Sequence, residues 1–207
     1  MKRRGLLLVV CGPSGVGKGT ICKALADKNA EIFLSVSVTT RKPRNAEVDG
    51  VSYHFKTEEE FKEMIRHDEL FEWAVYCNNY YGTPKKYIME MLQRGQDVVL
   101  EIDVQGALKV KEHFSEGVFI FVLPPSMEEL KKRIEGRGTE TKESIVERLK
   151  RAGQELKLTD AFQYIIVNDE LDHSVKTLEA IIIAEKCRSE RNQEIIKGVL
   201  ENDISVH

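Results

Sequence analysis

The stretch Gly12-Pro-Ser-Gly-Val-Gly-Lys-Gly-Thr20 decides the fold. It follows the apolar run at residues 6–11, which is typical of a buried strand, and it precedes a segment with Ile21 and Leu25 one helical turn apart. A glycine-rich turn between a strand and a helix is the setting of a phosphate-binding loop, or P-loop. Its backbone N–H groups and the helix N-terminus attract phosphate oxygens, and Lys18 adds a full positive charge. The sequence therefore predicts a site for a nucleoside triphosphate.

One position of this loop departs from the general P-loop pattern. A serine or threonine usually follows the lysine directly, and its hydroxyl binds Mg²⁺. Here Gly19 follows Lys18, and Thr20 comes one residue later. Thr20 is therefore the candidate magnesium contact, with Mg²⁺ expected as a cofactor that arrives with ATP.

Three further apolar runs predict buried strands, at residues 98–102, 118–123 and 164–167. Between them, apolar residues recur at spacings of three and four, as in the segment 171–182. Strands that alternate with helices predict an α/β fold with a parallel sheet and helices on both faces. We expect the P-loop NTPase type of core.

Two stretches interrupt the alternation of strands and helices. Residues 35–83 are rich in Thr, Arg, Asn, Glu, Gly and Tyr, which predicts a small inserted lobe. The polar run Gly136-Arg-Gly-Thr-Glu-Thr141 predicts the tip of a mobile lid. A single domain is expected, with the following parts: core at 1–34, inserted lobe at 35–83, core at 84–135, lid at 136–150 and core at 151–207.

Composition excludes several other classes of protein. The chain has 207 residues, 42% of them hydrophobic, and a formal net charge of -3, so no overall basic field favours a nucleic-acid partner. Its cysteines, Cys11, Cys22, Cys77 and Cys187, are scattered and predict neither a disulfide framework nor a zinc site. The apolar run after Met1 is too short for a signal peptide, and no run approaches the roughly 20 residues of a membrane span. We expect a cytoplasmic protein with no membrane partner.

A second polar position lies where the predicted strand at 98–102 ends. Asp103 follows the strand and Glu101 lies two residues earlier. Ligands gather at the carboxyl ends of parallel strands, so Asp103 is a candidate for Mg²⁺ or for the acceptor substrate. Capping the next helix explains Asp103 equally well. The segment also spells the GTPase motif D-x-x-G, but the matching N-K-x-D is absent, which disfavours a regulatory GTPase.

The predicted lobe opens with Arg41 and Arg44, three residues apart and beside several hydroxyls. Two such arginines can form a bidentate fork for a phosphate. Tyr53 and Glu72 come later in the same lobe. Taken singly, each of these residues has an ordinary interpretation as a solvated or half-buried side chain.

Taken together, the motifs closely resemble the guanylate kinase family over essentially the whole chain. The matching segments are GPSGVGKGT at Gly12, SVSVTTRKPR at Ser35, DGVSYHF at Asp49, FEWA at Phe71, YYGT at Tyr80, EIDVQG at Glu101, RIEGRGTE at Arg133 and VND at Val167. The resemblance implies transfer of a phosphoryl group from ATP to GMP, with dGMP as an alternative acceptor. Gly-Lys-Gly-Thr is an accepted loop variant among monophosphate kinases.

The resemblance also implies a role for individual residues. In the GMP site, Glu72 would accept from the guanine N1–H and 2-amino group, and Asp103 would lie on the acceptor side, which favours a functional role for it. The other GMP-site residues are Ser37 and Thr83 for guanine, and Arg41, Arg44, Tyr53 and Tyr81 for the phosphate. The expected ATP contacts are Gly12, Pro13, Ser14, Gly15, Val16, Gly17, Lys18, Gly19 and Thr20, with Asn168 near adenine.

For the transfer step, the resemblance implies that Arg133, Arg137 and Arg148 act with Lys18 when the lid closes. The lysines around these arginines are interpreted as solvated side chains. The neighbouring Arg151 receives no role.

Two alternatives remain besides the GTPase. An adenylate kinase has a similar phosphate loop, but the segments around Arg41, Glu72 and Tyr81 argue against it. A non-catalytic guanylate-kinase-like binding module usually lacks an intact phosphate loop, whereas this chain keeps Lys18 and its glycines.

Overall fold

The computed structural model describes residues 4–44, 47–76, 78–136 and 141–203, and its centre is a five-stranded sheet. The strands stand in the order β2 (Ile32–Leu34), β7 (Asp97–Glu101), β1 (Leu7–Cys11), β8 (Val118–Leu123) and β9 (Tyr164–Val167). Every pair of neighbours is parallel, with Leu8 of β1 opposite Val99 on one side and Val118 on the other. The predicted parallel core is confirmed.

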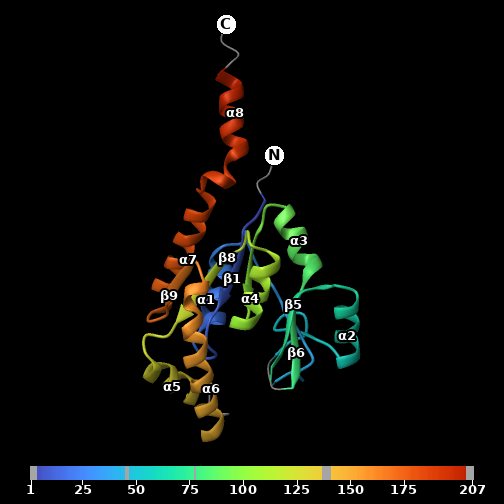
Figure 1. Cartoon of the computed structure of the whole chain (residues 1–207), viewed down its shortest axis with the longest axis vertical. Coiled ribbons are helices and arrows are strands. Elements are labelled where there is room, and N and C mark those ends of the chain that lie inside the picture. Colours follow the sequence, from blue (N-terminus) through green and yellow to red (C-terminus); the bar gives the residue numbers. More distant parts are fainter. Residues whose placement is uncertain (1–3, 45–46, 77, 137–140, 204–207) are drawn as a thin grey trace.

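The central strands β1, β7 and β8 are buried on both faces along nearly their whole length, as the unbroken apolar runs predicted, whereas the edge strand β9 leaves Ile165 and Val167 exposed. Leu8 and Val10 of β1 belong to one hydrophobic core, and Leu7 and Val9 belong to the other. The first core is completed by α1 (Lys18–Lys28), α5 (Met127–Glu135), α6 (Lys142–Glu155) and α7 (Leu171–Lys186). The second is completed by α3 (Lys85–Gln93), α4 (Val104–His113) and the 3-10 helix η1 (Leu156–Ala161) (Figure 1).

A second, smaller sheet forms the lobe inserted between β2 and α3. It contains β4 (His54–Phe55), β3 (Val38–Thr39), β6 (Asn79–Pro84) and β5 (Leu70–Tyr76) in that order, with α2 (Glu58–Arg66) beside it. Val38, Phe61 and Leu70 are its buried core. Thr57 and Glu60 close a capping box at the start of α2, which fixes where the helix begins.

One strand of the core was not expected, and the expected lid lies partly outside the described residues. β2 was not predicted, because it is only three residues long and lies at the edge of the sheet. Position 150, the expected end of the lid, lies inside the continuous helix α6. Residues 137–140, within the expected lid tip, lie outside the described residues.

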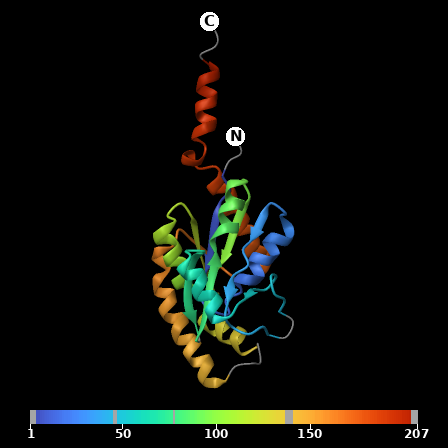
Figure 2. The same cartoon turned by 90° about the vertical axis from the view of Figure 1, so that its right-hand side faces the viewer.

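The last helix, α8 (Gln193–Asp203), follows the short 3-10 helix η2 (Ser189–Arg191). In both views α8 extends away from the two sheets (Figures 1 and 2). Within the described residues, no helix has the length and apolar character needed to cross a membrane. Of the cysteines described, Cys11 and Cys22 are buried free thiols and Cys187 is an exposed one, while Cys77 lies outside the described residues.

Candidate functional site

A cavity of about 830 Å³ opens where β1 and β7 end and is walled on its other side by the small sheet. Most of the predicted site residues line it: Gly12, Ser14, Gly15, Gly17, Lys18, Gly19, Thr20, Ser37, Arg41, Arg44, Tyr53, Glu72, Tyr81, Asp103 and Arg148. Pro13, Val16, Thr83, Arg133 and Asn168 do not line it, and Arg137 lies outside the described residues. Glu101, Glu147, Arg151 and Glu155 line it without having been predicted to do so.

The phosphate loop curls because three of its glycines adopt left-handed backbone angles. Gly12, Gly15 and Gly17 have φ of 141°, 92° and 98°, which other residues rarely adopt. At Gly17 a Cβ would also lie 2.4 Å from the amide nitrogen of Asn168. The Lys18 ammonium group donates to the carbonyls of Gly12 and Pro13, at 2.8 and 3.2 Å. The loop therefore holds the lysine charge inside its own curve.

Asn168 supports the phosphate loop through a hydrogen bond to its backbone. Its buried side chain donates from Nδ2 to the Val16 carbonyl at 2.7 Å and accepts from the Ser174 hydroxyl at 2.9 Å. Arg133 on α5 also donates to the Val16 carbonyl, at 3.3 Å, and its Nε donates to Glu129 at 3.0 Å. Sequence reasoning placed Asn168 near adenine and missed this support, because the partner atom belongs to a distant backbone carbonyl.

The position after Lys18 lies close to a carboxylate. A Cβ on Gly19 would lie 3.0 Å from a carboxylate oxygen of Glu101, which ends β7. The exposed Thr20 and Glu101 both line the cavity and place a hydroxyl and a carboxylate there, which are oxygen ligands that Mg²⁺ accepts. Over the described part of the chain, no three His, Cys, Asp or Glu side chains cluster to hold a metal by themselves. These residues fit a magnesium ion held chiefly by a nucleotide's phosphates.

Glu72 on β5 is a buried carboxyl group at the lobe side of the cavity. Thr83 on β6 lies opposite it in the strand pair, and its hydroxyl donates to Oε1 of Glu72 at 2.7 Å. On the other side, a Cβ on Gly106 of α4 would lie 2.8 Å from Oε2, so only glycine leaves room there. Burial raises the pKa of Glu72 to about 7; the Thr83 hydrogen bond and Lys109 oppose the rise, and Asp103 adds to it. The group therefore titrates near neutral pH.

Arg41 and Arg44 lie together at the cavity wall, with Glu47 between them. The Arg41 guanidinium meets the Glu47 carboxylate at 2.8 Å, and the Arg44 backbone N–H donates to the other carboxylate oxygen at 2.7 Å. Arg41 also lies over the ring of Tyr53, 5.4 Å from its centroid, and Tyr53 meets the ring of Tyr81 edge-on. The hydrogen bond from Arg41 lowers the pKa of Glu47. The Glu47 carboxylate therefore binds Arg41 as the phosphate of a ligand would. The sequence analysis did not predict this contact.

Asp103 is the N-cap of α4. Its Oδ1 accepts from the Gly106 backbone N–H at 2.7 Å, so the capping interpretation of the sequence is confirmed. The same carboxylate lines the cavity, and its Oδ2 lies 3.9 Å from Nη2 of Arg151. Capping and a place in the site are therefore compatible at this residue.

Helix α6, which contains residues 142–150 of the expected lid, reaches the phosphate loop. Nη2 of Arg148 donates to the Ser14 hydroxyl at 2.6 Å. One turn further along, Arg151 donates from Nε to Glu155 at 2.9 Å. α6 therefore brings two arginines to the cavity, and only Arg148 was predicted there.

The comparisons agree on one family. A family model described as guanylate kinase matches residues 4–185. A guanylate kinase of Caldanaerobacter subterraneus subsp. tengcongensis is 55% identical over 204 residues, covering 99% of each chain. One from Clostridium perfringens is 58% identical over 201 residues, covering 97% of this chain and 93% of its own.

A solved structure gives the same result. The crystal structure of guanylate kinase from Anaplasma phagocytophilum superposes with a TM-score of 0.82 at 33% sequence identity, covering 100% of this chain and 98% of that one. Its likeness extends over the parallel core and the inserted lobe alike. On these grounds the chain belongs to the guanylate kinase family.

Proposed function

We propose that the chain transfers the γ-phosphoryl group of ATP to GMP and releases ADP and GDP. The observation that carries this proposal is the buried Glu72, which Thr83 holds from behind and which lines the cavity that also holds Lys18 of the phosphate loop. Guanine presents two adjacent donors, N1–H and the 2-amino group, which an ionised Glu72 would accept. Adenine has an acceptor at N1 and no 2-amino group, so it would leave a buried carboxylate unpaired, at a cost of several kcal/mol.

The two substrates would take opposite ends of the cavity. ATP would place its phosphates in the loop from Gly12 to Thr20, with Asn168 on the adenine side. GMP would place its phosphate against Arg41, Arg44, Tyr53 and Tyr81, and its base against Glu72, with Ser37 and Thr83 beside it and Asp103 close to the acceptor. The shared lining of one cavity supports this division.

In the reaction, an oxygen of the GMP phosphate attacks the γ-phosphorus of ATP. The bond from that phosphorus to the β,γ-bridging oxygen breaks, and its electron pair leaves with ADP. The attacking oxygen is already anionic near neutral pH, so no general base is required. Lys18, Arg133, Arg137 and Arg148 would neutralise the charge on the phosphoryl group in transit, which is the main catalytic task in phosphoryl transfer. The contact between Arg148 and Ser14 supports this role for Arg148.

Mg²⁺ would enter with ATP, with Thr20 as its expected protein contact and the Glu101 carboxylate beside it. Bound there, it would neutralise phosphate charge and align the β- and γ-phosphates.

The lobe at 35–83 and the lid at 136–150 would close over the bound substrates and exclude water. The chain would work in the cytoplasm on small nucleotides, GMP and dGMP, and not on nucleic acid. Its formal net charge of -3 supports that last point, because the chain carries no overall positive charge to attract a nucleic acid.

A coupled assay of ADP release tests the proposal, with MgATP and GMP, dGMP, AMP, CMP, UMP or dTMP offered separately. We expect rapid turnover with GMP and little with AMP. Turnover with AMP would overturn the guanine pocket and keep the phosphate loop. A folded protein that binds GMP but turns over no acceptor would be a binding module, and the proposal would be wrong.

A further inference from the structure

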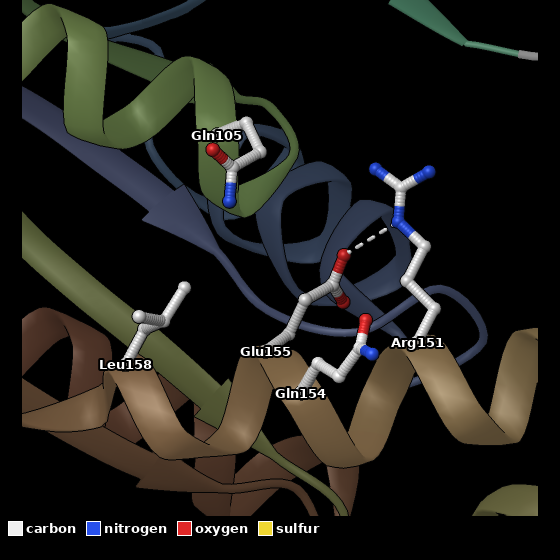
Figure 3. Close-up of a pocket in the computed structure, with 5 residues that line it drawn as sticks. All are labelled: Gln105, Arg151, Gln154, Glu155 and Leu158. Carbon is white, nitrogen blue, oxygen red and sulfur yellow. Dashed lines mark hydrogen bonds and ion pairs between the residues drawn. The ribbon is translucent and has the colours of Figure 1, made fainter.

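Arg151 and Glu155 of α6 form an ion pair at the edge of the cavity that the proposed mechanism does not use. Arg151 donates from Nε to Oε1 of Glu155 at 2.9 Å (Figure 3). Both residues line the cavity that holds Lys18 and Asp103. Both also line a smaller hollow of about 320 Å³ beside it, with Gln105, Gln154 and Leu158.

This pair differs from the ordinary ion pairs on the helix surfaces. The Glu155 side chain is only 10% exposed, whereas Glu58 in the comparable pair with Lys62 is 55% exposed. Exposed pairs one turn apart contribute a few tenths of a kcal/mol, because water screens them. A buried carboxylate instead needs a fixed cationic partner, since its desolvation is expensive. The Glu155–Arg151 contact therefore fixes the position of the arginine.

The guanidinium of Arg151 is oriented by this contact. Glu155 takes the Nε edge, and Figure 3 shows the two terminal nitrogens directed away from Glu155. One of them, Nη2, lies 3.9 Å from Oδ2 of Asp103. Asp103 follows the end of β7, so the terminal nitrogens face the edge of the sheet where substrates would bind.

The place of Arg151 along α6 brings it between the two substrate regions. Arg148, three residues earlier and on the same helix face, reaches Ser14 of the phosphate loop. Arg151 reaches Asp103, whose charge acts on Glu72 of the guanine pocket. Burial raises the pKa of Glu155, while Arg151 and Lys18 oppose the rise, which places this carboxylate within electrostatic reach of the phosphate loop.

We propose that Arg151 is a further phosphate-binding residue, which contacts the phosphoryl group in transit between ATP and GMP, and that Glu155 is the positioning residue that orients it. This inference rests on the proposed function. In chemical terms, Arg151 adds a fixed cation where negative charge passes from donor to acceptor, and it takes no proton. Glu155 accepts from Nε of Arg151, so we assign its effect on the reaction to the orientation of that arginine.

Four variants test the proposal: Arg151→Gln, Glu155→Gln, the double variant, and Lys150→Gln as the matched control on the exposed adjacent position. Each is assayed for kcat and for the KM of GMP and ATP, and its thermal unfolding is recorded. We expect Arg151→Gln to lower kcat about 10- to 100-fold with both KM values within about threefold of the parent. Glu155→Gln should lower kcat less, because the arginine remains but loses its anchor. Lys150→Gln should match the parent.

The double variant separates this role from a structural one. If Arg151 only neutralised the buried Glu155, removing both charges would restore parental kcat, and the proposal would be overturned. If Arg151 binds the phosphoryl group, kcat stays as low as in Arg151→Gln. The double variant also decides the matter if Arg151→Gln fails to fold, since it leaves no buried carboxylate without a cation. A kcat within twofold of the parent in a folded Arg151→Gln would equally refute the idea.

The proposed function is tested first, with the parent chain. A parent that releases no ADP with GMP rejects the kinase proposal before any variant is made. An active parent with an indifferent Arg151→Gln rejects only the inference about Arg151.

Discussion

Replacing Glu72 by glutamine tests the guanine pocket most directly. The carboxylate offers two acceptor oxygens, and Thr83 donates to Oε1 at 2.7 Å. In Glu72→Gln the single amide oxygen would keep the Thr83 hydrogen bond, which turns the NH₂ group toward the base. Guanine then loses one acceptor, and the NH₂ group of the glutamine faces a donor group of the base.

The magnitude follows from these two effects. A hydrogen bond to a charged group contributes about 2 kcal/mol, and an unsatisfied buried donor costs about 2 kcal/mol more. At roughly 1.4 kcal/mol per factor of ten, a total of about 4 kcal/mol lowers kcat/KM for GMP by about 10²- to 10³-fold. The KM for ATP should stay within about threefold, because Lys18 and the phosphate loop are unchanged.

The assay is coupled ADP release at pH 8, where Glu72, with a pKa of about 7, is ionised. IMP, which keeps N1–H but lacks the 2-amino group, serves as a second acceptor, and the preference for GMP over IMP should shrink in the variant. Glu69→Gln, on an exposed carboxylate three residues earlier, is the control. An equal loss for ATP and GMP, or an unchanged preference for GMP over IMP, would refute the role of Glu72.

Four further predictions follow from the geometry. Lys18→Ala should lower kcat by at least about 10³-fold with Tm within about 2 °C of the parent, and near-normal kcat would contradict the phosphate-loop role. GMP affinity should be constant only above about pH 8 and should fall as the pH drops through the Glu72 pKa of about 7. Glu72→Gln should lose this component and keep only the ionisation of GMP itself, as calorimetry across pH 5–9 would measure. Asn168→Ala removes the shorter of the two hydrogen bonds to the Val16 carbonyl and the acceptor of the buried Ser174 hydroxyl. It should lower Tm by about 5–15 °C and raise the KM for ATP, so an unchanged melting curve would count against the support role. Gly106→Ala pushes a methyl group against Glu72 and should raise the KM for GMP at least about tenfold while that for ATP stays constant, which steady-state kinetics would check.

The sequence predicted those parts of the fold whose physics is local. Residues 118–123 and 164–167 coincide with β8 and β9, because a short apolar run carries its own signal. β8 is buried along nearly its whole length, whereas β9 at the sheet edge leaves Ile165 and Val167 exposed. The phosphate loop was recognisable because the features that bind phosphate, its glycine spacing and its place between a strand and a helix, are visible in the local sequence. β2 has only three residues, so its apolar pattern is too short to predict a strand.

The parts that sequence reasoning missed depend on contacts between distant segments. Asn168 reaches a carbonyl 152 positions away in the chain, and no spacing rule encodes that. Glu155 and Arg151 have the spacing of a solvated surface pair, and only the packing of α6 against the end of the sheet buries the carboxylate. Glu47 needed the turn after Arg41 to bring it back onto the guanidinium.

If GMP binds as proposed, its phosphate must compete with Glu47 for Arg41. The Arg41 guanidinium is only 16% exposed and already holds an internal carboxylate at 2.8 Å, so an arriving phosphate exchanges one anion for another instead of displacing water. The electrostatic gain is then the difference between two similar pairs, and it is much smaller than the gain from a fresh contact. A phosphate monoester carries more negative charge than a carboxylate and can displace Glu47 from Arg41, whereas an uncharged nucleoside has no anionic group with which to do so. In the proposed site, the lobe would thereby distinguish a nucleotide from a nucleoside by this exchange of anions on Arg41, independently of how well the base fits.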